Sequence, residues 1–270
     1  MRDADFIKSD KGNTRLKSES KVNDVKMPFF SHLEELRARI IKSLIAVILA
    51  SGISIIFVKP IIRLLEKPAK SIHFLQLSPG EFLFSSIKVA GYSGLTIALP
   101  FILFQVLQFI LPGLTKKEKQ FIAPAVIGSA LLFFLGISFA LWVLIPAALK
   151  FLVTYGADIV EPLWSIERYL DFVFLLMLSS GLAFQLPVIQ LILGTLGILQ
   201  SQKMIANWRI VVMGSALAGA ILTPSTDPLT MILLASSITA LFLIGVGMVA
   251  ITEKIKEQTP SIVHPPSTSN

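Results

Sequence analysis

Residues 121–149 have the sequence FIAPAVIGSALLFFLGISFALWVLIPAAL, which contains no Asp, Glu, Lys or Arg. A helix needs about 20 apolar residues to cross the hydrocarbon core of a bilayer, which is about 30 Å thick. This stretch is long enough to cross. Its unbroken apolar run also differs from the alternating pattern of a membrane β-barrel strand. The stretch therefore predicts a membrane-spanning α-helix.

The composition of the whole chain favours the same class of protein. The 270 residues are 54% apolar and 15% charged, whereas soluble domains are about 45–50% apolar and about 25% charged. The chain has no cysteine, which excludes disulfides, thiolate zinc sites, iron–sulfur clusters and cysteine nucleophiles. No basic stripe with interleaved aromatic residues accompanies the net charge of +7, so no nucleic-acid partner is expected. We predict an all-α polytopic membrane protein with no cofactor and no metal site.

Six apolar segments are predicted to cross the membrane. The fifth, Ile210–Leu222, is about 20 Å long as a helix, which is short for an average bilayer. Trp208 and Arg209 at one end and Thr223 and Pro224 at the other are typical of the membrane interface, so we predict a short span rather than a re-entrant segment. The six predicted spans are Ile40–Val58, Leu83–Leu111, Phe121–Ile145, Tyr169–Leu193, Ile210–Leu222 and Leu229–Ile251.

The Lys and Arg residues predict the orientation of these spans. Six crossings put both termini on one side. With that side inside, seventeen Lys and Arg residues fall on inner segments and six on outer loops, so both termini are predicted to be cytoplasmic or stromal. The first outer loop goes against this pattern, with Lys59, Arg63, Lys67 and Lys70. Its apolar residues at 61, 62, 64 and 65 predict an amphipathic segment on the outer surface of the membrane.

The two ends of the chain differ from the six-span core, which covers residues 27–254. Residues 1–26 are polar, mixed in charge and without an apolar run. We predict a disordered tail that is neither a cleavable signal peptide nor an organellar transit peptide. Residues 255–270 end in a Pro/Ser-rich stretch and are also predicted to be disordered. No internal repeat is evident, which disfavours a transporter built from inverted repeats.

The first candidate site lies just before the first span, in the sequence SHLEELR at residues 31–37. Ser31 and Glu34 form a capping box, which predicts that a helix begins there. Glu35 is then the spare acid. One interpretation is a helix-surface pair of Glu35 with Arg39, four residues along, and helix physics alone favours it. The other is a binding site.

A second capping box, Thr115 with Glu118, starts the helix of the third span. The lysines beside it at 116, 117 and 119 are explained by the preference of cytoplasmic loops for positive charge. From the residues alone, the structural role of Glu118 is favoured over a functional one.

Polar side chains inside the predicted spans form the third candidate. Gln185 lies in the fourth span two residues before Pro187, and Asp171 lies near the outer end of that span. Such side chains either form hydrogen bonds between helices or face a water-filled cavity, and the sequence does not decide between these two roles. Residues 91–94 (GYSG) resemble the loop of an intramembrane serine protease, but no histidine lies in a span to act as base. Close helix approach is the favoured role of these small residues.

Four motifs occur in order along the chain: HLEELR at 32–37, FILPGL at 109–114 followed by Glu118, FQLP at 184–187, and LTP at 222–224. With these motifs the sequence resembles the TatC family, the multi-spanning receptor subunits of the twin-arginine protein translocase. The resemblance covers about residues 27–254. The stretches LSPGEF at 77–82 and LTPSTDP at 222–228 are most similar to the cyanobacterial and plastid branch.

The resemblance implies that the protein binds the twin-arginine signal peptides of folded precursors. Neighbouring arginines on an extended peptide point to opposite sides and need two acidic sites, which Glu35 and Glu118 can supply. The resemblance also assigns Leu33, Arg37 and Phe109 to this recognition surface. It implies a membrane receptor without a catalytic centre, in a bacterial cytoplasmic or a thylakoid membrane.

The resemblance further implies hetero- and homo-oligomers with single-span partner subunits of the TatA/TatB type, which contact spans five and six. Transport is then driven by the proton gradient. Many family members carry glutamate where this chain has Gln185, so a polar role is expected there but not a proton-carrying one. The loop with Pro224 and Asp227 differs in length from that of some relatives.

Two other classes of protein are weighed against this one. A small-molecule or ion permease would have its site near Gln185, but the central spans lack ionisable residues at their middle. An intramembrane hydrolase is the more distant alternative.

Overall fold

Long apolar helices dominate the chain, which is described by a computed structural model over residues 27–69, 72–110, 122–155, 163–223 and 227–257. Five helical stretches are long and apolar enough to cross a membrane: Phe30–Ile56, Glu81–Ile110, Ala125–Tyr155, Ile166–Thr195 and Pro228–Ile255. The shorter apolar helix Trp208–Leu222 is the sixth. The predicted number of spans and the short fifth span are confirmed.

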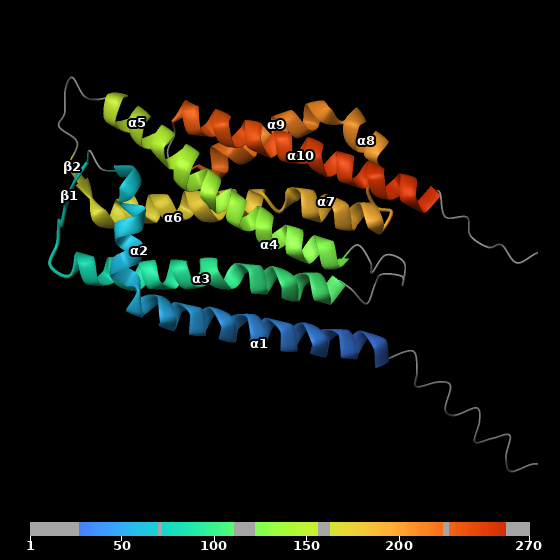
Figure 1. Cartoon of the computed structure of the whole chain (residues 1–270), viewed down its shortest axis with the longest axis horizontal. Coiled ribbons are helices and arrows are strands. Elements are labelled where there is room, and N and C mark those ends of the chain that lie inside the picture. Colours follow the sequence, from blue (N-terminus) through green and yellow to red (C-terminus); the bar gives the residue numbers. More distant parts are fainter. Residues whose placement is uncertain (1–26, 70–71, 111–121, 156–162, 224–226, 258–270) are drawn as a thin grey trace, which may run out of the picture.

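Most helices run roughly along one long axis (Figure 1). In chain order the elements are α1 (Met27–Ile56), α2 (Val58–Leu65), the 3-10 turn η1 (Lys67–Ala69), β1 (His73–Leu75), α3 (Glu81–Ile110), α4 (Ile122–Phe139), the π-helical turn η4 (Ala140–Leu144), α5 (Ile145–Tyr155), β2 (Leu163–Ser165), α6 (Ile166–Ala183), α7 (Leu186–Thr195), α8 (Ser201–Ala206), α9 (Trp208–Leu222) and α10 (Pro228–Glu257). Two elements thus form the fourth span, α6 and α7, and three form the third.

The first helix begins earlier than the sequence predicts. The capping box of Ser31 and Glu34 would start it at Ser31, but α1 begins at Met27. Pro28 suits the first turn of a helix, where its missing N–H is not needed. The helix therefore begins before the first predicted span, as the capping box indicated, but it begins at Met27 and not at Ser31.

Small residues let the helices approach closely. A Cβ on Gly94 of α3 would clash with the Ser51 backbone of α1. A Cβ on Gly136 of α4 would lie 2.8 Å from the carbonyl oxygen of Ser180 in α6. Close helix approach is therefore confirmed at Gly94, whereas Gly91 has nothing within 4 Å of such an atom. The core lies between these helices, around the fully buried Val89, Phe133 and Leu176.

We call the end of the bundle away from the termini the outer end. Connecting segments join the helices there. Strands β1 and β2 pair in parallel, with His73 opposite Leu163. The hydroxyl of Tyr169 in α6 donates to the carbonyl of Leu65 at 2.6 Å. The predicted amphipathic segment is the helix α2, but its residues Ile62 and Leu65 are buried in the protein. Its apolar face therefore packs on the bundle instead of lying wholly in the membrane.

The described chain begins and ends at the same end of the molecule, the inner end (Figure 1). This agrees with the prediction that both termini lie on one side. The predicted tails 1–26 and 258–270 lie outside the described residues. Residues 255–257, predicted to belong to the second tail, are the last turn of α10.

Candidate functional site

A polar cluster lies at the inner end, where α1 and α3 run side by side (Figure 1). The Arg39 guanidinium donates to Glu35 Oε1 from Nε at 3.1 Å and from Nη2 at 2.5 Å. Its Nη1 donates to the side-chain oxygens of Gln105 at 3.2 Å and Gln108 at 2.7 Å. One arginine therefore joins an acid of its own helix to two glutamines of α3, and the predicted pair of Glu35 with Arg39 is formed.

The other carboxylate oxygen of Glu35 has a different environment. Glu35 Oε2 lies 3.7 Å from His32 Nδ1, which is longer than a hydrogen bond. The His32 ring stacks on the Phe109 ring, with centroids 4.2 Å apart and planes 11° apart. Because the Glu35 side chain is 32% exposed, a ligand can reach this carboxylate beside an aromatic surface formed by both helices.

The remaining residues assigned to this surface are not joined to the cluster by a contact that the described residues show. Leu33 and Arg37 are exposed on α1. Among the described residues, no hydrogen bond or ion pair joins Arg37 to Glu35. Glu118 lies outside the described residues, as does Pro224. The chain leaves α3 at Ile110, directly after Phe109, so the segment that carries Glu118 starts beside this cluster.

Gln185 lies at a break in the fourth span, between the end of α6 and the start of α7. Its side chain is buried, accepts from Ser129 Oγ at 2.7 Å and donates to the Ser129 carbonyl oxygen at 3.1 Å. Pro187 has no N–H to continue the helix, which explains the break. Of the two roles left open by the sequence, helix–helix hydrogen bonding is the one that is formed.

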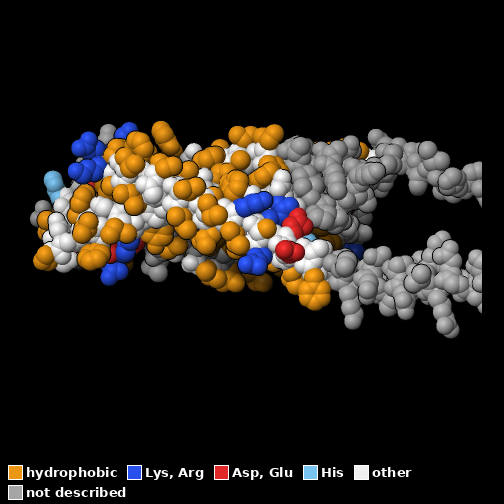
Figure 2. Space-filling view, turned by 90° about the horizontal axis from the view of Figure 1, so that it is seen from below, with side chains coloured by type: hydrophobic (Ala, Val, Ile, Leu, Met, Phe, Trp, Pro, Cys, Tyr) orange, Lys and Arg blue, Asp and Glu red, His pale blue; other side chains and the backbone are white. Residues whose placement is uncertain are grey.

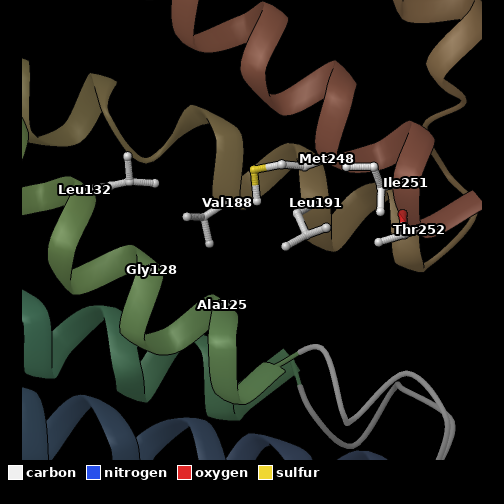
Figure 3. A pocket seen from close by; sticks show the side chains of 8 residues that line it. All are labelled: Ala125, Gly128, Leu132, Val188, Leu191, Met248, Ile251 and Thr252. Carbon is white, nitrogen blue, oxygen red and sulfur yellow. The ribbon is translucent and has the colours of Figure 1, made fainter. Parts of the chain in front are cut away.

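An apolar pocket opens next to this break, between α4, α7 and α10 (Figure 3). Its volume is about 240 Å³, and side chains such as Leu132, Val188, Leu191 and Met248 line it. The polar side chain in its lining, Thr252, donates to a carbonyl of its own helix. No charged side chain lines this pocket, and this part of the chain offers no support for a permease site near Gln185.

Asp171 and Asp227 both have structural partners near the outer end. Lys88 Nζ of α3 lies 3.1 Å from Asp171 Oδ2 and 2.5 Å from Glu167 Oε1 in α6. Asp227 is buried directly before α10, and its Oδ1 accepts from the backbone N–H of Thr230 at 2.7 Å. Within the described ranges, no group of three or more His, Cys, Asp or Glu could hold a metal ion.

Sequence reasoning missed three polar residues. Gln105 and Gln108, three residues apart in an apolar span, are a detectable signal for a polar contact between helices. Glu81 is buried at the start of α3 and accepts from Ser165 Oγ at 2.6 Å and from the N–H of Ser78 at 3.1 Å. The capping-box spacing of Ser78 and Glu81 was the available signal.

The fold and this cluster define a multi-pass α-helical membrane protein with a polar site at the inner end of its first two spans. The family described as "Sec-independent protein translocase protein (TatC)" matches residues 31–236. The chain is 56% identical over 232 residues to the TatC protein of Synechocystis sp., covering 86% of this chain and 91% of that protein. It is 50% identical over 232 residues to the chloroplastic TATC protein of Arabidopsis thaliana, covering 85% and 68%.

A crystal structure described as the twin arginine translocase receptor TatC has the same fold. Its TM-score is 0.71 at 33% sequence identity, and the match covers 82% of this chain and 99% of that one. The chain belongs to the TatC family, as its motifs predicted. It is thus a subunit of the Sec-independent protein translocase, a transport component rather than an enzyme, in a cell or thylakoid membrane.

Proposed function

We propose that the inner cluster binds the twin-arginine motif of signal peptides, with Glu35 accepting one arginine and Glu118 the other. The observation that carries this proposal is the half-buried Glu35 carboxylate. Its Oε1 is oriented by Arg39, and its Oε2 lies beside the stacked rings of His32 and Phe109. An arginine of the peptide can bond to Oε2 without displacing the first pair.

Two separate acids suit two neighbouring arginines. The side chains of adjacent residues in an extended peptide point in opposite directions, so a single carboxylate cannot accept both. Glu118 follows α3 by eight residues, and the chain enters that segment beside Phe109. A peptide lying along the inner ends of α1 and α3 would place one of its arginines at Glu35, and the other would require the second acid.

Arg39 also prepares the site before the peptide binds. A lone carboxylate in this half-buried position would be costly to desolvate, and Arg39 neutralises it. Because Gln105 and Gln108 hold the same guanidinium, Arg39 keeps partners if Glu35 turns toward the peptide. Arginine is preferred over lysine in the peptide because its planar fork can bond a carboxylate with two hydrogens.

The test is photo-crosslinking of a signal peptide with two arginines to membranes that contain the chain. Glu35→Gln and Glu118→Gln should each reduce crosslinking roughly tenfold, since a charge-assisted bond becomes a neutral one. Gln still serves in a capping box, so the Glu118 variant separates binding from helix capping.

Glu34→Gln is the matched control, because Glu34 is an exposed acid one residue away. We expect it to crosslink like the unaltered chain. A peptide with two lysines should crosslink weakly to every variant. Unchanged crosslinking in the chain carrying both Glu35→Gln and Glu118→Gln would overturn the assignment.

We also propose that α9 and α10 recruit the single-span partner subunits. Ile210, Gly214, Leu217 and Ile221 form one exposed stripe on α9, at spacings of three and four residues. Opposite this stripe, Ser215 and Gly219 pack on α10. An exposed glycine in such a stripe allows close approach of another helix.

A further inference from the structure

The helix α2 and the turn η1 that follows it carry an exposed basic stripe. Lys59 and Arg63 of α2 and Lys67 of η1 follow one another at intervals of four residues, and all three are exposed. The opposite face carries Val58, Ile61, Ile62 and Leu65, which are buried or half-buried against the bundle. The basic stripe therefore faces away from the protein.

This stripe lies on the side of the membrane where basic residues are unusual. Multi-span proteins concentrate Lys and Arg on the inner side, yet α2 lies at the outer end, opposite the termini (Figure 1). Figure 2 shows Lys and Arg side chains gathered at this end. Three neighbouring cations on one face of α2 and η1 repel one another, so an anionic partner would stabilise them.

The described acids of the outer end do not supply that partner. Glu167 and Asp171 bind Lys88, Glu81 accepts from backbone N–H groups and Ser165, and Asp227 caps α10. Glu66 is half-buried beside the stripe. Within the described part of the chain, no ion pair includes Lys59, Arg63 or Lys67.

A pocket continues from the stripe along the side of the bundle. Its volume is about 270 Å³, and it is lined by Leu64, Lys67 and Pro68 on one side and by Leu141, Trp142 and Pro146 on the other. Trp142 is 79% exposed and belongs to the π-helical turn η4, an irregularity that is frequent at functional sites. The pocket is thus apolar with a lysine at its margin.

The orientation of α2 places both features at one depth of the membrane. The helix runs across the long axis of the bundle, whereas the spans run along it (Figure 1). Because the apolar face of α2 packs on the bundle, its basic face is left to meet the lipid headgroups, and clustered Lys and Arg at that level attract anionic lipids. Trp side chains likewise concentrate at this interface.

We propose that Arg63 and Lys67 bind the headgroup of an anionic lipid of the outer leaflet, with its apolar part in the pocket against Leu64 and Trp142. An amphipathic ligand matches a site in which cations border an apolar lining. An acidic polypeptide would satisfy the cations but would leave the pocket unfilled. The site therefore selects one lipid class at the outer end.

Tryptophan fluorescence in vesicles tests this site directly. The chain has three tryptophans, and Trp164→Phe with Trp208→Phe leaves Trp142 as the reporter. The full chain is reconstituted in phosphatidylcholine vesicles with a fixed fraction of phosphatidylglycerol, and either lipid carries bromine on its acyl chains as a contact quencher. We expect brominated phosphatidylglycerol to quench Trp142 more than its mole fraction predicts, and brominated phosphatidylcholine to quench it less.

Arg63→Gln with Lys67→Gln should weaken this preference about tenfold or more, since each cation near an anionic surface contributes about a fivefold factor. Lys150→Gln with Arg168→Gln, which removes two other exposed outer cations, is the matched control and should keep the preference. If each lipid quenches Trp142 in proportion to its mole fraction in the chain that keeps only this tryptophan, the proposal is overturned and an acidic polypeptide is favoured as the partner. An unchanged preference in the Arg63 and Lys67 variant would overturn it too.

Discussion

At the scale of single residues, Gln185 illustrates how a polar group is accommodated within a span. Its amide donates to one Ser129 atom and accepts from another, so both of its ends are bonded inside the bundle. A buried glutamic acid could reproduce these two bonds in its neutral form. The position therefore requires a hydrogen-bonding side chain but no charge.

We therefore predict that Gln185→Glu keeps transport, whereas Gln185→Leu lowers stability. Leucine would leave Ser129 Oγ without its acceptor, at a cost of about 1–3 kcal/mol. Thermal unfolding in detergent measures the stability, and export of a twin-arginine precursor measures the transport. Complete loss of export in a folded Gln185→Glu variant would contradict this role.

Residue-level reasoning from the sequence succeeded where the contact is local. Glu35 and Arg39 are four residues apart, and a helix brings such residues together whatever the tertiary fold. The bonds from Arg39 to Gln105 and Gln108 span 66 and 69 residues. No local pattern encodes that pairing, so the polar contact with α3 was missed although both glutamines are conspicuous in an apolar span.

At the scale of elements, α9 is the helix whose exposed stripe we expect to bind a partner. A Cβ on Gly214 would have nothing within 4 Å, so Gly214→Leu should leave the chain folded. Its side chain should nevertheless keep another helix from approaching α9. We predict a severalfold loss of copurification with single-span partner subunits.

Gly52→Leu is the control for this variant. Gly52 is exposed on α1 and likewise has nothing within 4 Å of a Cβ. This variant should retain its partners. Equal copurification of the Gly214 and Gly52 variants would show that the α9 stripe is not the contact.

The spans could be predicted from the sequence, whereas the two short strands could not. The spans follow from the length of each apolar run, because the bilayer thickness fixes the length needed. The strands β1 and β2 have three residues each, too few for an alternating pattern, and they pair across a long sequence separation. The break at Pro187 was predictable because proline interrupts helix hydrogen bonding.

At the scale of the whole molecule, the two ends of the bundle are held differently. Outer segments distant in sequence are joined by Tyr169 to Leu65, by Lys88 to α6 and by the β1–β2 pair. At the inner end, Arg39 joins α1 to α3, and Glu253 accepts from the N–H of Ser201 at 3.1 Å. The inner ends of α1 and α3 are therefore held by contacts of their own, separate from those of the outer end.

Glu81 allows the two ends to be tested separately. Its carboxylate accepts from the N–H groups of Leu77 at 2.5 Å and Ser78 at 3.1 Å, and from Ser165 Oγ. Glu81→Ala removes all three bonds, so we predict a thermal midpoint lower by a few degrees. Glu81→Gln keeps one acceptor oxygen and should have an intermediate midpoint.

Glu81→Ala should leave the selectivity for the two-arginine peptide intact. Glu81 and Gln108 lie at opposite ends of one helix, about 40 Å apart. We measure crosslinking at a temperature below the thermal midpoint of Glu81→Ala. The yield with the two-arginine peptide, divided by the yield with the two-lysine peptide, should then match that of the unaltered chain. If the ratio falls in a Glu81 variant that is still folded at this temperature, the outer end takes part in recognition, because unfolding could not then account for the change.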